Sequence, residues 1–162
     1  MRESDVRKFR SDLHAILLRL SENANEYSIL KLKELGRRLE KLYRKGLVKI
    51  NHSVMELVCS KYLLMKDYDI QIEYPLKQFL VCDLMTSKGD GTMIVEIETG
   101  YTPPEHALDP DTYNRARLVS RIARYSSYAT RFALATPPHN ILQIPTPWGN
   151  RQEIKVKKMS FL

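Results

Sequence analysis

Three carboxylates lie close together in the middle of the sequence, in an otherwise apolar stretch. Asp83 follows the apolar run FLVC, and Glu96 and Glu98 follow a second run, TMIV, after the turn SKGDG. Two short β-rich runs joined by a glycine-containing turn predict a β-hairpin. Side chains alternate along a strand, so Glu96 and Glu98 should share one face, while Ile97 points to the other. If the strands pair around the turn, Asp83 lies on the neighbouring strand, near Glu96.

Carboxylates that converge in an apolar sheet need a positive charge between them. They are rarely buried without a partner, and like charges repel strongly there. A divalent cation removes this conflict, and oxygen ligands suit Mg²⁺ or Mn²⁺. We therefore predict a site for one of these ions, with Asp83, Glu96 and Glu98 as its ligands. A bound ion of this kind lowers the pKa of a bound water and so activates it for hydrolysis.

This pattern resembles the PD-(D/E)xK, or restriction-endonuclease-like, nucleases. Their signature is an aspartate, a turn, and then apolar-Glu-x-Lys on the next strand. Here Asp83 is followed thirteen positions later by Glu96, Ile97 and Glu98. Glu98 stands where the family usually has lysine, although some restriction enzymes of this fold carry E-x-E. The resemblance covers about residues 51 to 136.

The resemblance implies a metal-dependent DNA nuclease whose mixed sheet is flanked by helices. A glutamate on the family's first core helix often reaches the metal through water, and Glu56 matches it in type and order; the alternative is an exposed helix glutamate. Glu98 would bind the metal, or a second one, or accept the proton of the attacking water. Arg121, on a helix expected over 112–127, would supply the charge of the missing lysine. Arg121 and Tyr125 also resemble a Gln-x-x-x-Tyr element on the same helix of some members, with arginine in place of glutamine.

Basic side chains are concentrated in two parts of the chain. Residues 1–50 contain thirteen Lys or Arg against seven Asp or Glu, and the net charge of the whole chain is +7. The helix expected over 112–127 has four arginines and no acid. The first group either contacts DNA phosphates or forms a solvated helix face, and the second either contacts DNA or neutralises the acids. The residues expected to bind DNA are Arg37, Arg38, Lys41, Arg115, Arg117 and Arg124.

Apolar spacing predicts the elements around the acids. Beyond the hairpin, the expected helices cover about 4–21, 28–46, 51–66 and 112–127, and the expected strands cover 67–74 and 130–136. We expect Ser28 to cap the second helix, Gly46 to stop it and Pro75 to end the first strand. A closing hairpin around Trp148 is predicted for the tail. The chain is thus read as an N-terminal helical hairpin, 1–50, joined to a nuclease-like α/β core, 51–162.

Composition limits the class of protein. The 162 residues are 43% hydrophobic and 28% charged, as in soluble globular proteins. No apolar run approaches the ~20 residues of a membrane span, and the charged start is unlike a secretory signal. Cys59 and Cys82 have no C-x-x-C spacing, so we expect reduced thiols and a cytoplasmic location. The leucine stripes of the first two helices also predict a homodimer.

Three interpretations of function stay open at this point. The chain is a DNA nuclease that uses Mg²⁺ or Mn²⁺, or it keeps the nuclease fold without catalysis, for example as a DNA-binding subunit of a repair complex. The third interpretation is an unrelated α/β domain whose acids are salt-bridged to the arginines. Three acids on adjacent strands favour the first interpretation, and the missing lysine favours the second.

Overall fold

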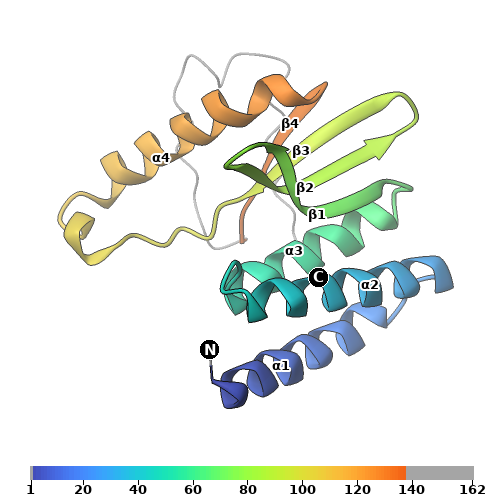
Figure 1. The fold of residues 1–162 in the computed structure, drawn as a ribbon. Coiled ribbons are helices and arrows are strands. Elements are labelled where there is room, and N and C mark those ends of the chain that lie inside the picture. The colour runs from blue at the N-terminus through green and yellow to red at the C-terminus, as the bar shows by residue number, and fades with distance from the viewer. Residues whose placement is uncertain (1, 138–162) are drawn as a thin grey trace. The chain divides into compact units, whose positions relative to one another are not determined.

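The computed structural model describes residues 2–137 and divides the chain into two compact units, Met1–Ile72 and Glu73–Leu162. Over the described residues the fold is α/β, with four α-helices and a mixed four-stranded sheet (Figure 1). The division predicted from the sequence falls after residue 50, whereas the structure keeps the third helix with the first two.

The first unit contains the helices α1 (Glu3–Ser21), α2 (Glu26–Arg44) and α3 (Ile50–Leu64). The predicted hairpin of the first two helices is observed (Figure 1). Asn25 caps α2, because its side chain accepts a hydrogen bond from the backbone N–H of Ser28 at 2.8 Å. The prediction that Ser28 is the cap was therefore wrong by three residues. Gly46 follows the end of α2 with a φ of +72°, a conformation that favours glycine.

Side chains from the apolar stripes of α1 and α2 are buried. They include Val6, Phe9, Leu13, Leu32, Leu35 and Leu39. The two helices approach closely at Gly36, where a Cβ atom would lie 2.8 Å from Cδ1 of Leu17. The rings of Phe9 and Tyr43 stack with their centroids 3.9 Å apart. These apolar stripes are therefore largely buried by contacts within one chain. The homodimer stays a prediction.

The sheet contains β1 (Asp69–Lys77), β2 (Leu80–Lys88), β3 (Gly91–Ile97) and β4 (Arg131–Ala135), in that order. The predicted hairpin is observed, since β2 and β3 pair antiparallel, and β3 then pairs parallel with β4. The strand β1 begins in the first unit and continues through Pro75, so the prediction that Pro75 ends it was wrong. An edge strand tolerates proline because the missing N–H need not face a partner.

The helix α4 (Pro110–Tyr125) connects β3 to β4 and covers one face of the sheet (Figure 1). Asp109 caps it by accepting a hydrogen bond from the N–H of Thr112 at 3.2 Å, and proline occupies its first turn. Its buried side chains Leu118, Ile122 and Tyr125 pack against Ile94, Phe132 and Leu134 of the strands. This packing fixes which side of α4 faces the sheet.

Two short 3₁₀ helices, Pro104–His106 and Ser126–Tyr128, flank α4. Both cysteines are free and buried, as expected. Among the helices in the described part of the chain, none has the length and apolar character needed to cross a membrane. The hairpin predicted around Trp148 lies outside the described residues.

Candidate functional site

Asp83 and Glu96 lie opposite each other where the β2–β3 ladder ends. The last pair in the regular register is Leu84 with Val95, so Asp83 and Glu96 are the next positions. Oε1 of Glu96 accepts a hydrogen bond from the N–H of Asp83 at 3.1 Å. Oδ2 of Asp83 accepts one from the N–H of Ile97 at 2.6 Å. At this end of the hairpin two carboxylates therefore take the place of carbonyl oxygens as acceptors.

Arg121 of α4 contacts all three predicted acids. Its Nη1 atom lies 2.6 Å from Oε2 of Glu96 and 3.2 Å from Oδ2 of Asp83. Its Nε atom lies 3.6 Å from Oε2 of Glu98. Asp83, Glu96 and Glu98 thus converge on one place, and the cation at that place is a guanidinium. We call these four residues the acidic cluster.

Glu98 follows the end of β3 and is held from two sides. Its Oε1 atom lies 3.0 Å from Nη2 of Arg117 and accepts a hydrogen bond from the N–H of Gly100 at 3.1 Å. Arg117 also donates from Nη1 to the carbonyl oxygen of Tyr101 at 2.8 Å. Arg117, which we expected to bind DNA, is therefore engaged with Glu98 and with the chain that follows it.

Burial sets the protonation of the acidic cluster. Glu96 is 1% exposed, and burial raises its pKa to about 8; the negative charge of Asp83 adds to this, and Arg121 opposes it. Burial alone would lower the pKa of Arg121, but the charges of Asp83, Glu96 and Glu98 outweigh it and raise that pKa. For Glu96, burial and the charge of Asp83 therefore act in one direction, and the contacts with Arg121 and with the N–H of Asp83 act in the other.

Two further side chains border the acidic cluster, and the sequence did not place them there. Burial raises the pKa of the Cys82 thiol to about 12, and the charges of Glu96 and Asp83 add to this. The hydroxyl of Tyr125 donates to the carbonyl oxygen of Val81 at 3.0 Å, which ties α4 to β2. Burial also raises the pKa of Tyr125. The only sequence signal for Tyr125 is its position four residues after Arg121.

The donor set of the acidic cluster suits a hard divalent cation, because three carboxylates offer only oxygen ligands. Nη1 of Arg121 lies between Asp83 and Glu96, so a metal ion there requires the guanidinium to move aside. The residues fit the ion by their chemistry, and the metal role of Asp83, Glu96 and Glu98 stays a prediction.

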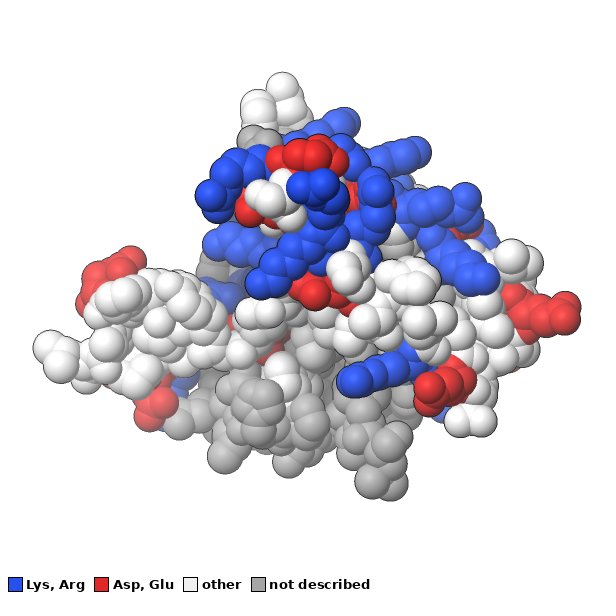
Figure 2. All heavy atoms as spheres, turned by 90° about the horizontal axis from the view of Figure 1, so that it is seen from below, with Lys and Arg blue, Asp and Glu red and all other residues white. Residues whose placement is uncertain are grey.

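The other basic residues proposed for DNA contact lie on exposed helix surfaces. Arg124 is exposed and lies over the ring of Tyr125, with its Cζ atom 5.5 Å from the centroid. Arg115 is also exposed, near the start of α4. On α2 the exposed cations include Arg37, Arg38 and Lys41. Figure 2 shows one face of the molecule on which lysine and arginine side chains crowd together, with a few acids among them.

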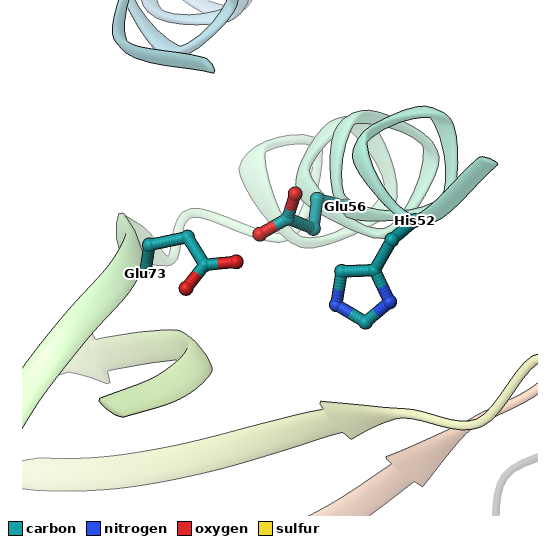
Figure 3. A group of neighbouring side chains, drawn as sticks. All are labelled: His52, Glu56 and Glu73. Carbon is teal, nitrogen blue, oxygen red and sulfur yellow. The ribbon is translucent and has the colours of Figure 1, made fainter. Parts of the chain in front are cut away.

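Glu56 lies in the first unit, on α3, and its side chain is buried. The alternative of an exposed helix glutamate was therefore wrong. His52 lies one turn earlier, and both side chains project from the same side of the helix (Figure 3). Figure 3 also draws Glu73, which belongs to the second unit. The water-mediated metal contact of Glu56 stays a prediction.

We compared the chain with protein-family models, curated proteins and solved structures, and none of them matched. The resemblance to the PD-(D/E)xK nucleases therefore depends on the residues and the geometry described above.

Proposed function

We propose that the chain is a metal-dependent deoxyribonuclease with a site of the PD-(D/E)xK type. The observation that carries this proposal is the convergence of Asp83, Glu96 and Glu98 on one cation, where two inner strands of the sheet end. Grouping three acids around one shared arginine is electrostatically unfavourable, because like charges repel strongly where little water reaches them. Perturbed carboxyl groups with a specific charge partner are typical of functional sites.

The order of the elements supports the same proposal. A hairpin carries Asp83 and Glu96, and α4 then crosses over the sheet to the parallel strand β4. The crossover brings a helix with a cation, Arg121, over the ends of the strands that carry the acids. We propose that this arrangement is a restriction-endonuclease-like core.

Asp83 and Glu96 would hold Mg²⁺ or Mn²⁺, which when bound polarises a phosphoryl oxygen and lowers the pKa of a bound water. Arg117 and the N–H of Gly100 both contact the carboxylate of Glu98. In this proposal that carboxylate would accept a proton from the attacking water. Arg121, once released from Asp83 and Glu96, keeps a positive charge beside the site. That charge would stabilise the negative charge that develops on the phosphate, as the family's lysine would.

A cleavage assay tests the proposal. Labelled duplex, single-stranded and branched DNA are incubated with the full chain, with Mg²⁺, with Mn²⁺ and with EDTA. We expect cleavage only with a divalent cation, and its loss by orders of magnitude in Asp83→Asn. The asparagine oxygen can still accept the hydrogen bond from the N–H of Ile97, so the strand should keep its shape. Asp90→Asn, at the exposed hairpin turn, removes the same charge from the same hairpin and serves as the control.

Cleavage that continues in EDTA, or that Asp83→Asn leaves unchanged, would contradict the proposal. Melting curves of both variants show whether any loss comes from unfolding.

A second candidate is a DNA-binding domain that keeps the fold without catalysis. The observation that favours it is Arg121 itself, which already neutralises Asp83 and Glu96 in this structure. Calorimetric titration with Mn²⁺ separates the two candidates. Heat of binding that disappears in Asp83→Asn supports the nuclease, whereas absent heat and absent cleavage, together with DNA binding, support the second candidate.

A further inference from the structure

One exposed side of α2 carries a row of cations. Arg37, Lys41 and Lys45 follow each other at intervals of four residues, and all three are exposed. A rise of 1.5 Å per residue puts successive members ~6 Å apart along the same side of the helix. Lys31 and Arg38 lie beside the row and line the same hollow of the surface. We call Arg37, Lys41 and Lys45 the α2 basic row.

Other cations of the helical hairpin are engaged in ion pairs. Arg10 and Arg44 both pair with Glu40, which joins α1 to α2. Arg37 instead donates from Nε to the carbonyl oxygen of Lys33 at 3.3 Å. Within residues 2–137, neither Lys41 nor Lys45 pairs with an acidic side chain. Lys31, beside the row, pairs with Glu34 at 3.4 Å. Within the same described range, Arg37, Lys41 and Lys45 have no such acidic partner, unlike the cations between α1 and α2.

The regular spacing indicates what kind of partner the row fits. Like charges four residues apart disfavour a helix, so this row is costly to the free protein. A polymer of uniform negative charge removes that cost, and duplex DNA carries one charge per about 1.7 Å of its axis. Single-stranded DNA is usually held by several stacking aromatic side chains. Tyr27 is the one aromatic residue among the described residues that line this hollow.

We propose that the α2 basic row binds the phosphate backbone of duplex DNA, without reading the base sequence. Lysine and arginine on a rigid helix position a protein on DNA through phosphate contacts, and these contacts carry no sequence information. The inference goes beyond the proposed chemistry of the acidic cluster and does not depend on it. For a nuclease, the row would add a second contact with the substrate.

The test measures how the affinity of the full chain for a labelled duplex changes between 50 and 200 mM salt. Fluorescence anisotropy in EDTA reports binding without cleavage. The test variant replaces Arg37, Lys41 and Lys45 by glutamine. The matched control replaces Arg7, Lys8 and Arg19 of α1, which are also exposed, so that both variants lose the same charge.

Each phosphate contact contributes about 0.9 to the slope of log affinity against log salt. Three lost contacts should therefore make the affinity loss between 50 and 200 mM salt smaller by about 40-fold in the test variant than in the wild type. The control variant should keep the wild-type slope. Melting curves confirm that both variants are folded.

Several results would overturn the inference. Equal changes in both triple variants would mean that only the net charge matters, and an unchanged slope in the test variant would remove the row from the interface. Tighter binding of single strands than of duplex, or no binding by the wild type at 50 mM salt, would exclude the proposed partner. Because binding is measured in EDTA, these failures are distinct from an absence of metal-dependent cleavage, which would contradict the nuclease proposal alone.

Discussion

Replacing Arg121 by alanine removes the cation that three neighbouring carboxylates share. The side chain of Arg121 is 19% exposed, and that of Glu96 is 1% exposed, so little water can reach Glu96 to compensate. Breaking a buried ion pair by removing one partner costs about 3–5 kcal/mol. At about 2–4 °C per kcal/mol for a chain of this size, the Tm of Arg121→Ala should fall by about 6–20 °C without divalent metal.

Divalent metal should then recover part of the lost stability. A ligand at about 100 times its Kd stabilises the folded state by roughly 2.7 kcal/mol, which corresponds to about 5–11 °C. The wild type should gain less from the same Mn²⁺ concentration, because the ion must first displace the guanidinium from Asp83 and Glu96. Cleavage by the variant should nevertheless be slower, since the positive charge near the phosphate is gone.

Differential scanning fluorimetry with EDTA and with a series of Mn²⁺ concentrations measures these shifts. Arg124→Ala is the control, because Arg124 lies on the same helix and is exposed. If Arg121→Ala melts like the wild type, the three acids do not depend on this cation and the reasoning fails. If the variant is destabilised but Mn²⁺ never restores it, the acidic cluster is an internal ion-pair network with no metal function.

Substitutions at three other positions test further parts of the reasoning. In Glu98→Gln, cleavage should fall by about 10²–10⁴-fold while DNA affinity in EDTA holds or rises; a large loss of stability with normal cleavage would instead make Glu98 a structural partner of Arg117. Because the pKa of Glu96 is raised from 4.5 to about 8, the folded metal-free chain keeps a proton that the unfolded chain releases. Its stability in urea should fall as pH rises from about 4.5 to about 8, by at most about 1.4 kcal/mol per pH unit, and Glu96→Gln should flatten this slope. Gly36→Ala should change Tm little, because the tip of Leu17 can move, whereas Gly36→Leu should cost about 1–3 kcal/mol in thermal unfolding.

Local patterns predicted the elements well. Apolar spacing in α1, α2 and α4 and the glycine turn between β2 and β3 are signals within one short segment. The errors came from competition between neighbouring residues. Asn25 and Ser28 both suit a helix cap, and only the backbone decides between them. Pro75 is compatible with a strand at the edge of a sheet. The sequence around Pro75 does not show which strand lies at the edge, because strand order depends on pairing between distant segments.

The candidate site was predictable in part for the same reason. Strand alternation predicted that Glu96 and Glu98 point to the same side, and the turn placed Asp83 beside them. Helical periodicity gives the angle of an arginine around α4 but not its position along the sheet. That position decides whether Arg121 reaches all three acids and whether Arg117 reaches Glu98.

The two hydrogen bonds at the end of the β2–β3 ladder make the site observable without a substrate. The amide protons of Asp83 and Ile97 are donated to carboxylate oxygens. Their hydrogen-exchange rates and NMR chemical shifts should therefore respond when either carboxylate gains a proton, a metal ion or a different cation. The amides of Val95 and Leu84, in the regular ladder one pair away, provide an internal reference. The amide of Asp83 thus reports on the carboxylate of Glu96, and the amide of Ile97 reports on that of Asp83.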